Sequence, residues 1–211
     1  MKRAFFFSTA LSAALLLALG FAGCESRSSS KSNSNSNYTE EYSSGYSKEG
    51  GEIVNGFVLP PYPDQTLNDS TLLGIDSNNN GVRDDVERWL IFKYKDHHKI
   101  VTEIGFQGAR AAQIIIQDPS KAKETYHILD AAQFCNFYFE IYAQYNNESI
   151  LLDHTIITST AFKTMQFNTK ERIEAYLAYD KKLSGGVYSG PKSSKDYRAA
   201  CAFNADKLLG E

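Results

Sequence analysis

The chain has 211 residues and a formal charge of −3 at pH 7, and 42% of its residues are hydrophobic and 22% charged. About 160 residues lie beyond the N-terminal segments considered below, which is enough for one domain with a single core. No cluster of basic residues occurs along the chain, and this argues against nucleic acid as a partner.

The first 24 residues have the pattern of a secretory signal. Lys2 and Arg3 precede an apolar run over residues 4–19, which is short for a membrane span. Small residues then lead to Cys24 in the sequence FAGC. This segment resembles the lipobox of bacterial lipoproteins, in which the cysteine is lipidated and becomes the first mature residue. An ordinary signal peptide cut nearby, or an uncleaved anchor, is the alternative interpretation.

The lipoprotein resemblance implies a location in the bacterial cell envelope, with residues 1–23 as signal peptide and a lipid anchor on Cys24 that attaches the protein to the membrane. Each buried methylene of an acyl chain contributes about 0.8 kcal/mol, so several chains give stable attachment. Glu25, in place of an aspartate, favours the outer membrane over the inner one. Residues 24–50 are rich in Ser and Asn and predict a flexible tether, with a mean reach of about 25–30 Å.

Residues 51–211 are expected to form one all-α domain, a compact bundle of about five to six helices with a looped N-terminal third. Three prolines and several turn-forming residues within residues 52–75 predict extended chain and turns there. Apolar residues at helical spacing predict helices over about 84–97, 100–117, 119–145, 148–164, 169–184 and 194–209. In the second helix Gly105 and Gly108 would allow close packing.

Two of these helices have conflicting signals. Asp118 and Pro119 are a good N-cap and first residue for the third helix, yet the aromatic residues at its centre, FCNFYFEIY, would also suit a strand. The fourth helix contains HTIITSTAF, whose β-branched residues disfavour a helix. The fifth has clearer signals, with Asn168 as the expected N-cap and two lysines in its last turn.

The stretch DSNNNGVRDDVE, residues 76–87, places four carboxylates within one short loop. Repulsion among carboxylates this close has to be offset, and a cation is the obvious candidate. The stretch matches D-x-[DN]-x-[DN]-G-x₅-E at every required position. The predicted oxygen ligands are the side chains of Asp76, Asn78, Asn80, Asp84 and Glu87 and the backbone carbonyl of Val82. Hard oxygen ligands favour Ca²⁺ over zinc or copper.

This loop resembles the calcium loop of EF-hands and the Asp/Asn-rich repeats of the thrombospondin type 3 family. It differs from an EF-hand because prolines exclude a normal entering helix, no second loop pairs with it, and Arg83 occupies a position that is usually aliphatic. The resemblance therefore implies a lone structural calcium site, with a dissociation constant of roughly 10⁻⁴ to 10⁻³ M. An Asn-rich turn before a helix is the alternative. The N-terminal third is poor in apolar residues and is expected to have little else to hold it against the first helix.

Cys135 and Cys201 are the two cysteines that remain after Cys24 is assigned to lipid. In an oxidising envelope an even pair predicts one disulfide, and the alternative is two buried free thiols. That bond would join the third helix to the C-terminal helix.

No common catalytic motif occurs in the chain. Three titratable residues are of interest: Glu140 within the aromatic run, Asp180 near the end of the fifth helix, and His154 on an expected apolar stripe with Ile157. A solvated Glu140, a solvated Asp180 and a partly buried, non-catalytic His154 are the simpler interpretations. The leading hypothesis is therefore a non-catalytic binding module with a protein or glycan partner in the envelope. An immunity-type or inhibitor lipoprotein and an envelope glycan hydrolase are the alternatives.

Overall fold

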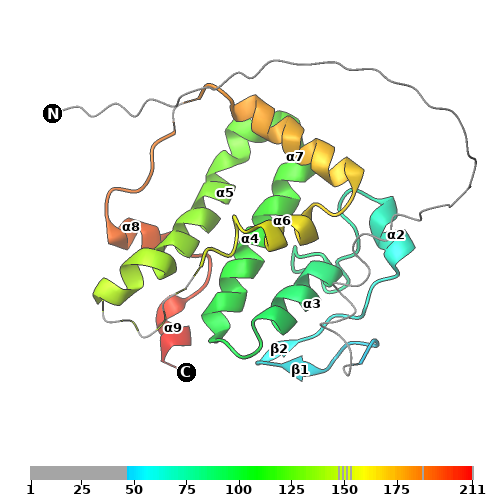
Figure 1. The fold of residues 1–211 in the computed structure, drawn as a ribbon, viewed down its shortest axis with the longest axis horizontal. Coiled ribbons are helices and arrows are strands. Elements are labelled where there is room, and N and C mark those ends of the chain that lie inside the picture. The colour runs from blue at the N-terminus through cyan, green and yellow to red at the C-terminus, as the bar shows by residue number, and fades with distance from the viewer. Residues whose placement is uncertain are drawn as a thin grey trace, which may run out of the picture. The chain divides into compact units, whose positions relative to one another are not determined.

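A computed structural model describes residues 47–146, 148, 150, 152, 154–186 and 188–210 (Figure 1). The expected signal peptide, residues 1–23, the lipidation site Cys24 and the tether up to residue 46 lie outside these residues. The described part of the chain is all-α, as predicted. Its α-helices are α2 (Gln65–Ser70), α3 (Asp84–Lys93), α4 (Lys99–Gln117), α5 (Ala122–Phe137), α6 (Thr160–Gln166), α7 (Lys170–Leu183), α8 (Ser194–Ala199) and α9 (Ala205–Leu209).

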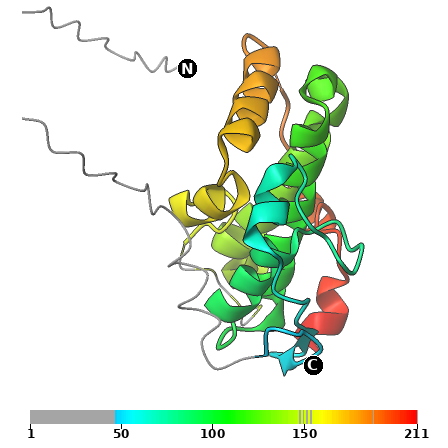
Figure 2. The same ribbon diagram turned by 90° about the vertical axis from the view of Figure 1, so that its right-hand side faces the viewer.

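Helix α4 is the centre of the bundle and packs against α3, α5, α7 and α9. Its two glycines permit these close approaches, because a Cβ at Gly105 would lie 2.5 Å from Leu90 of α3 and a Cβ at Gly108 would lie 2.7 Å from Ile157. The predicted role of both glycines in packing is confirmed. Helix α7 lies across one end of the α4–α5 pair, which is visible in both views (Figures 1 and 2).

The third predicted helix is continuous but changes its hydrogen-bonding pattern along its length. Asp118 accepts a hydrogen bond from Ser120 N at 3.1 Å and Pro119 begins a 3₁₀ turn, Pro119–Lys121, as the N-terminal signal predicted. After α5 comes a π-helical segment, Tyr138–Tyr142, and then a 3₁₀ turn, Ala143–Asn146. The aromatic centre is therefore helical, and the alternative of a strand is wrong.

The predicted helix over 148–164 is wrong for most of its length, because among the described residues of this range only those of α6, at its end, are helical. Asn136 of α5 explains the difference: its Oδ1 accepts hydrogen bonds from Ile156 N at 2.9 Å and Ile157 N at 3.3 Å. These backbone groups therefore bond to a distant side chain instead of to a helix of their own. Ser159 then caps α6 by accepting from Phe162 N at 3.2 Å.

Several helix boundaries also differ from the predictions. Helix α3 ends at Lys93, four residues before the predicted end. Thr169, and not Asn168, caps α7, because Asn168 Oδ1 instead accepts from the guanidinium groups of Arg83 and Arg172. The predicted C-terminal helix is split into α8 and α9, and Cys201 lies between them.

The looped N-terminal third contains a short β-hairpin and a short helix, neither of which was predicted. Strands β1 (Ile53–Val54) and β2 (Phe57–Val58) form an antiparallel hairpin across Asn55 and Gly56, both at positive φ, and α2 follows. An Asn-Gly pair is a typical turn for such a hairpin.

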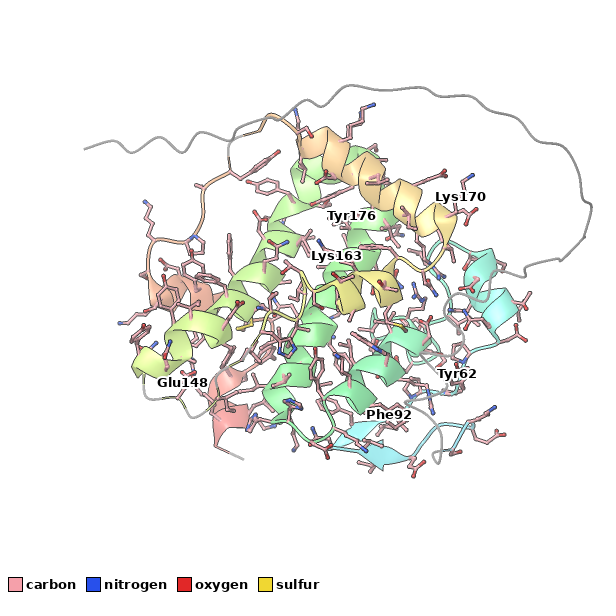
Figure 3. The ribbon with its side chains drawn as sticks, viewed as in Figure 1. Tyr62, Phe92, Glu148, Lys163, Lys170 and Tyr176 are labelled. Atoms are coloured by element: carbon pink, nitrogen blue, oxygen red, sulfur yellow. A yellow bond between two sulfur atoms is a disulfide. The ribbon has the colours of Figure 1, made fainter. Side chains whose placement is uncertain are left out.

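Buried arginines hold the N-terminal third, together with a few buried apolar side chains such as Val54 and Leu59. Arg88 of α3 donates to Pro60 O at 2.6 Å and Ser47 O at 3.1 Å, and its guanidinium lies 5.6 Å from the ring centre of Tyr62 and 5.5 Å from that of Phe92 (Figure 3). The arginine guanidinium is planar, donates several hydrogen bonds and stacks on aromatic rings. One side chain therefore fixes the two irregular segments around Ser47 and Pro60. The expectation that little holds this region against α3 is therefore wrong.

The disulfide predicted between Cys135 and Cys201 is present, with an Sγ–Sγ distance of 2.04 Å. It joins α5 to the connection between α8 and α9. An ion pair beside it makes a second link, because Arg198 Nε of α8 lies 2.9 Å from Glu148 Oε1, which also accepts from Tyr138 (Figure 3). The C-terminal segment is thereby part of the fold.

Candidate functional site

The loop of residues 76–87 follows α2 and ends within the first turn of α3. Asp84 N donates to Ile75 O at 2.8 Å, which closes the loop at its base. Because α3 begins at Asp84, Glu87 lies in its first turn, as the calcium-loop pattern predicts. The predicted twelve-residue register therefore coincides with a loop-to-helix junction.

The backbone of this loop coils around the side chain at its first position. Asp76 accepts hydrogen bonds from Asn80 N at 3.1 Å and Gly81 N at 2.8 Å. Asn80 Oδ1 in turn accepts from Val82 N at 2.8 Å. Gly81 has φ of 83°, in the left-handed region that glycine adopts without steric cost, so the predicted sharp turn is there.

Three of the predicted ligand side chains converge at the centre of the loop. The amide nitrogens of Asn78 and Asn80 lie 3.2 and 2.8 Å from Glu87 Oε2. Glu87 is only 4% exposed. Burial, with smaller contributions from the charges of Asp84 and Asp76, raises its pKa to about 7, although the hydrogen bonds from Asn80 and Asn78 act in the opposite direction.

Asp84 is the second buried acid of the loop. Its Oδ1 accepts from Ser77 N at 3.0 Å, whereas its Oδ2 finds no hydrogen-bond partner among the described residues. Burial raises the pKa of this carboxyl as well. A buried carboxylate oxygen without a partner has a substantial desolvation cost, which a cation would offset.

The loop is closed by hydrogen bonds and not by a cluster of acids. Among the described residues, no group of three or more His, Cys, Asp or Glu side chains is arranged to hold a metal ion. The donor set nevertheless fits Ca²⁺, because it consists of oxygens and because an Asn amide presents its oxygen in place of its nitrogen after a half-turn. The Asn78 and Asn80 amides would have to make that turn, since both direct N–H groups at Glu87.

Arg83 and Asp85, two charged residues inside the loop, have a role that sequence reasoning missed. Arg83 Nε lies 2.6 Å from Asp85 Oδ1, and the side chains are 0% and 2% exposed. The Arg83 guanidinium also donates to the backbone oxygens of Met165 and Gln166, which joins the loop to α6. The signal in the sequence was the arginine at a position that is usually aliphatic.

A second buried arginine, Arg172 of α7, fixes the segment that enters the loop. It donates to the carbonyl oxygens of Thr71 at 3.1 Å and Leu72 at 3.0 Å, and pairs with Asp69 at 3.2 Å. Burial lowers the pKa of this guanidinium, and the charge of Arg83 lowers it further. Two guanidinium groups thus position the loop: that of Arg83 lies within the motif, and that of Arg172 lies outside it.

The three other residues of interest do not form a common site. Glu140 is half-buried in the π-helical segment and accepts from Asn136 Nδ2 at 3.2 Å. Asp180 is exposed on α7, as expected. His154 is exposed too, so its predicted partly buried position is wrong, because the helix that would have placed it beside Ile157 does not form.

A cavity of about 390 Å³ lies beside Glu140. The side chains that line it come from α5, the π-helical segment, the irregular segment before α6, and α8. They are Gln133, Phe134, Asn136, Phe137, Glu140, Thr155, Ile157, Thr158 and Tyr197. A cavity of this size suits a small molecule.

Comparisons of the chain with protein-family models, with curated proteins and with solved structures found no match. None of the helices in the described part of the chain is long and apolar enough to cross a membrane. The geometry of the loop and of the Glu140 cavity therefore carries the functional argument.

Proposed function

We propose that this chain is a lipid-anchored protein of the bacterial cell envelope, whose helical domain has one structural Ca²⁺ site and acts as a non-catalytic binding module. The observation that carries the calcium site is the pair of buried carboxyl groups on one loop, Asp84 and Glu87, which are 1% and 4% exposed. Two acids this deeply buried are stable as carboxylates only beside positive charge.

The residues of the loop have distinct roles in this proposal. Asp76, Asp84 and Glu87 supply negative charge, Asn78 and Asn80 supply neutral oxygens, and the Val82 carbonyl leaves an apolar side chain that is buried in the core. A bound Ca²⁺ supplies the positive charge. With three acids and no second loop, the affinity belongs to the weak range of extracellular modules, roughly 10⁻⁴ to 10⁻³ M.

Calcium in this position would stabilise a loop that is already attached to helices α6 and α7. Arg83 and Arg172 hold the loop in place by themselves, so the ion adds stability without assembling the fold. At about 1 mM Ca²⁺ and a dissociation constant near 0.1 mM, linkage adds about 1.4 kcal/mol. The site is thus a structural support, and a conformational switch is not part of the proposal.

Isothermal calorimetry of the full chain with CaCl₂ tests the calcium site, with MgCl₂ as control. We expect binding of one Ca²⁺ and much weaker binding of Mg²⁺, which requires tight octahedral geometry. No heat of binding up to 10 mM Ca²⁺, beyond the weak end of the range given above, would leave the loop as an Asn-rich turn.

The anchor is supported by the lipobox-like sequence FAGC and the polar tether that follows it. Mass spectrometry of the mature N-terminus is expected to find an acylated Cys24. A mature chain that begins beyond Cys24 would contradict the anchor and leave the calcium site unaffected.

The binding role is tested separately. When the full chain is immobilised on a resin, a pull-down from an envelope extract is expected to capture a partner that the resin without the chain does not capture. Clearing of a peptidoglycan gel by the purified chain would contradict the non-catalytic part of the proposal and favour the hydrolase alternative.

A further inference from the structure

The Glu140 cavity has rigid walls because one buried side chain connects them. Asn136, 2% exposed, donates from Nδ2 to both Glu140 Oε2 and Thr155 Oγ1 at 3.2 Å. Its Oδ1 accepts from the backbone of Ile156 and Ile157. The amide thus uses both of its ends, and it fixes the carboxylate of one wall against the backbone of the other.

Two further contacts fix the wall opposite α5. Thr155 Oγ1 and Thr158 Oγ1 lie 3.0 Å apart, and Ile157 packs directly over Gly108 of α4. The segment before α6 therefore keeps a defined shape without being helical, and its hydroxyl groups line the cavity next to Glu140.

The carboxylate enters the cavity from a π-helical turn. The segment Tyr138–Tyr142 follows α5 directly. Single π turns within helices are uncommon and are frequent at functional sites, because the wider turn changes the direction in which side chains project. Glu140 is the one charged side chain among the described residues that line the cavity.

Aromatic rings form the remaining wall. The ring of Tyr197 from α8 lies 5.5 Å from that of Phe134 and 5.4 Å from that of Phe137, measured between centroids. Phe137 remains 39% exposed, and all three side chains line the cavity. The face of an aromatic ring attracts a cation electrostatically, and the attraction is larger where water is displaced.

We propose that this cavity binds a small organic cation, one that carries a primary ammonium or a guanidinium group on a short carbon chain. The Glu140 carboxylate would accept charge-assisted hydrogen bonds from the cationic group, and the rings of Phe134, Phe137 and Tyr197 would cover the group and its methylenes. The cavity of about 390 Å³ has room for such a molecule. This inference rests on the binding role proposed above and names its ligand class, but it requires neither the calcium site nor the lipid anchor.

The test uses the full chain in detergent and two probes of known chemistry. Calorimetric titration with agmatine and with 1,5-diaminopentane is expected to give binding at one site, and titration with the neutral N-acetylglucosamine trimer is expected to give none. Glu140→Gln keeps the size and the hydrogen bond with Asn136 but removes the charge, so affinity should fall at least 10-fold. Phe137→Ala should weaken binding several-fold, since it removes one aromatic face.

Glu124→Gln is the matched control, because Glu124 is an exposed glutamate on the same helix, α5, and does not line the cavity. Its affinity for both probes should equal that of the unaltered chain, and circular dichroism and melting temperature should verify that all three variants are folded. Equal affinities of the chain and the folded Glu140→Gln variant would overturn the proposal. So would binding of the sugar trimer with no binding of either cation, which would indicate a glycan site. A chain that binds neither cation but captures a partner from envelope extract refutes the cavity proposal alone.

Discussion

Arg83 Nε and Asp85 Oδ1 lie 2.6 Å apart in the interior, within the same loop that carries the predicted calcium ligands. The pair makes the loop part of the core, since Arg83 also donates to backbone oxygens at the end of α6. Asn68 of α2 donates to the other oxygen of Asp85 at 3.0 Å. One buried ion pair thus connects α2, α3 and α6.

Replacement of Arg83 by Met should therefore destabilise the protein strongly. The change leaves Asp85 buried without its positive partner, which typically costs about 3–5 kcal/mol. Denaturant unfolding followed by circular dichroism measures the loss. Lys170→Ala is the control, because Lys170 and Glu174 form an exposed ion pair with side chains 79% and 63% accessible (Figure 3), and its loss should be under about 1 kcal/mol. Equal effects of the two substitutions would refute the structural role of Arg83.

The calcium ligands can be tested by their effect on melting. The full chain should melt a few degrees higher in 1 mM Ca²⁺ than in chelator, which corresponds to about 1.4 kcal/mol if the dissociation constant is near 0.1 mM. Glu87→Gln and Asp76→Ala should abolish this difference and leave the helix content unchanged. The exposed-site variant Glu124→Gln should retain it. Identical melting curves of the unaltered chain in Ca²⁺ and in chelator would sink the calcium site.

The stability of the metal-free protein should fall as the pH rises from about 4.5 to about 7. Burial raises the pKa of Glu87 from 4.5 in the unfolded chain to about 7 in the fold, so the folded state binds more protons within this window. Unfolding free energy decreases with pH wherever the folded state binds more protons, by a total on the order of 2 kcal/mol here. Urea unfolding in chelator at several pH values measures the slope. Glu87→Gln should have a flatter profile over the same window, and a profile identical to that of the unaltered chain would contradict the assignment.

The disulfide should contribute mainly by restricting the unfolded chain. Cys135 and Cys201 are 66 positions apart, and closing a loop of that length contributes roughly 4 kcal/mol by chain entropy. Labelling of the denatured, unreduced mature chain should find neither thiol free, and Cys135→Ser together with Cys201→Ser should lower the unfolding free energy by up to that amount. Two labelled thiols before reduction would show that the bond does not form in the native protein.

The sequence by itself determined the features that depend on local interactions. The loop register from Asp76 to Glu87 follows from a glycine at positive φ and from side-chain oxygens that accept from the backbone within five residues. The start of the third predicted helix at Asp118 and Pro119 and the extent of α4 follow from capping and apolar spacing, which also act over a few residues. The cysteine pairing could be predicted because only two cysteines remained.

Tertiary structure alone decided the features that depend on partners far along the chain. Asn136 takes the backbone N–H groups of Ile156 and Ile157, which lie 20 and 21 positions away, and the predicted helix over 148–164 fails for that reason. Arg83 reaches Gln166 across 83 positions, and Arg172 reaches Leu72 across 100. A guanidinium buried among carbonyl oxygens has the same sequence signature as one in solvent, because its charge and spacing along the helix are the same. Only the fold distinguishes the two, because it removes water from these groups and supplies their hydrogen-bond partners. The position of Glu140 at a cavity likewise depends on segments that the fold brings together.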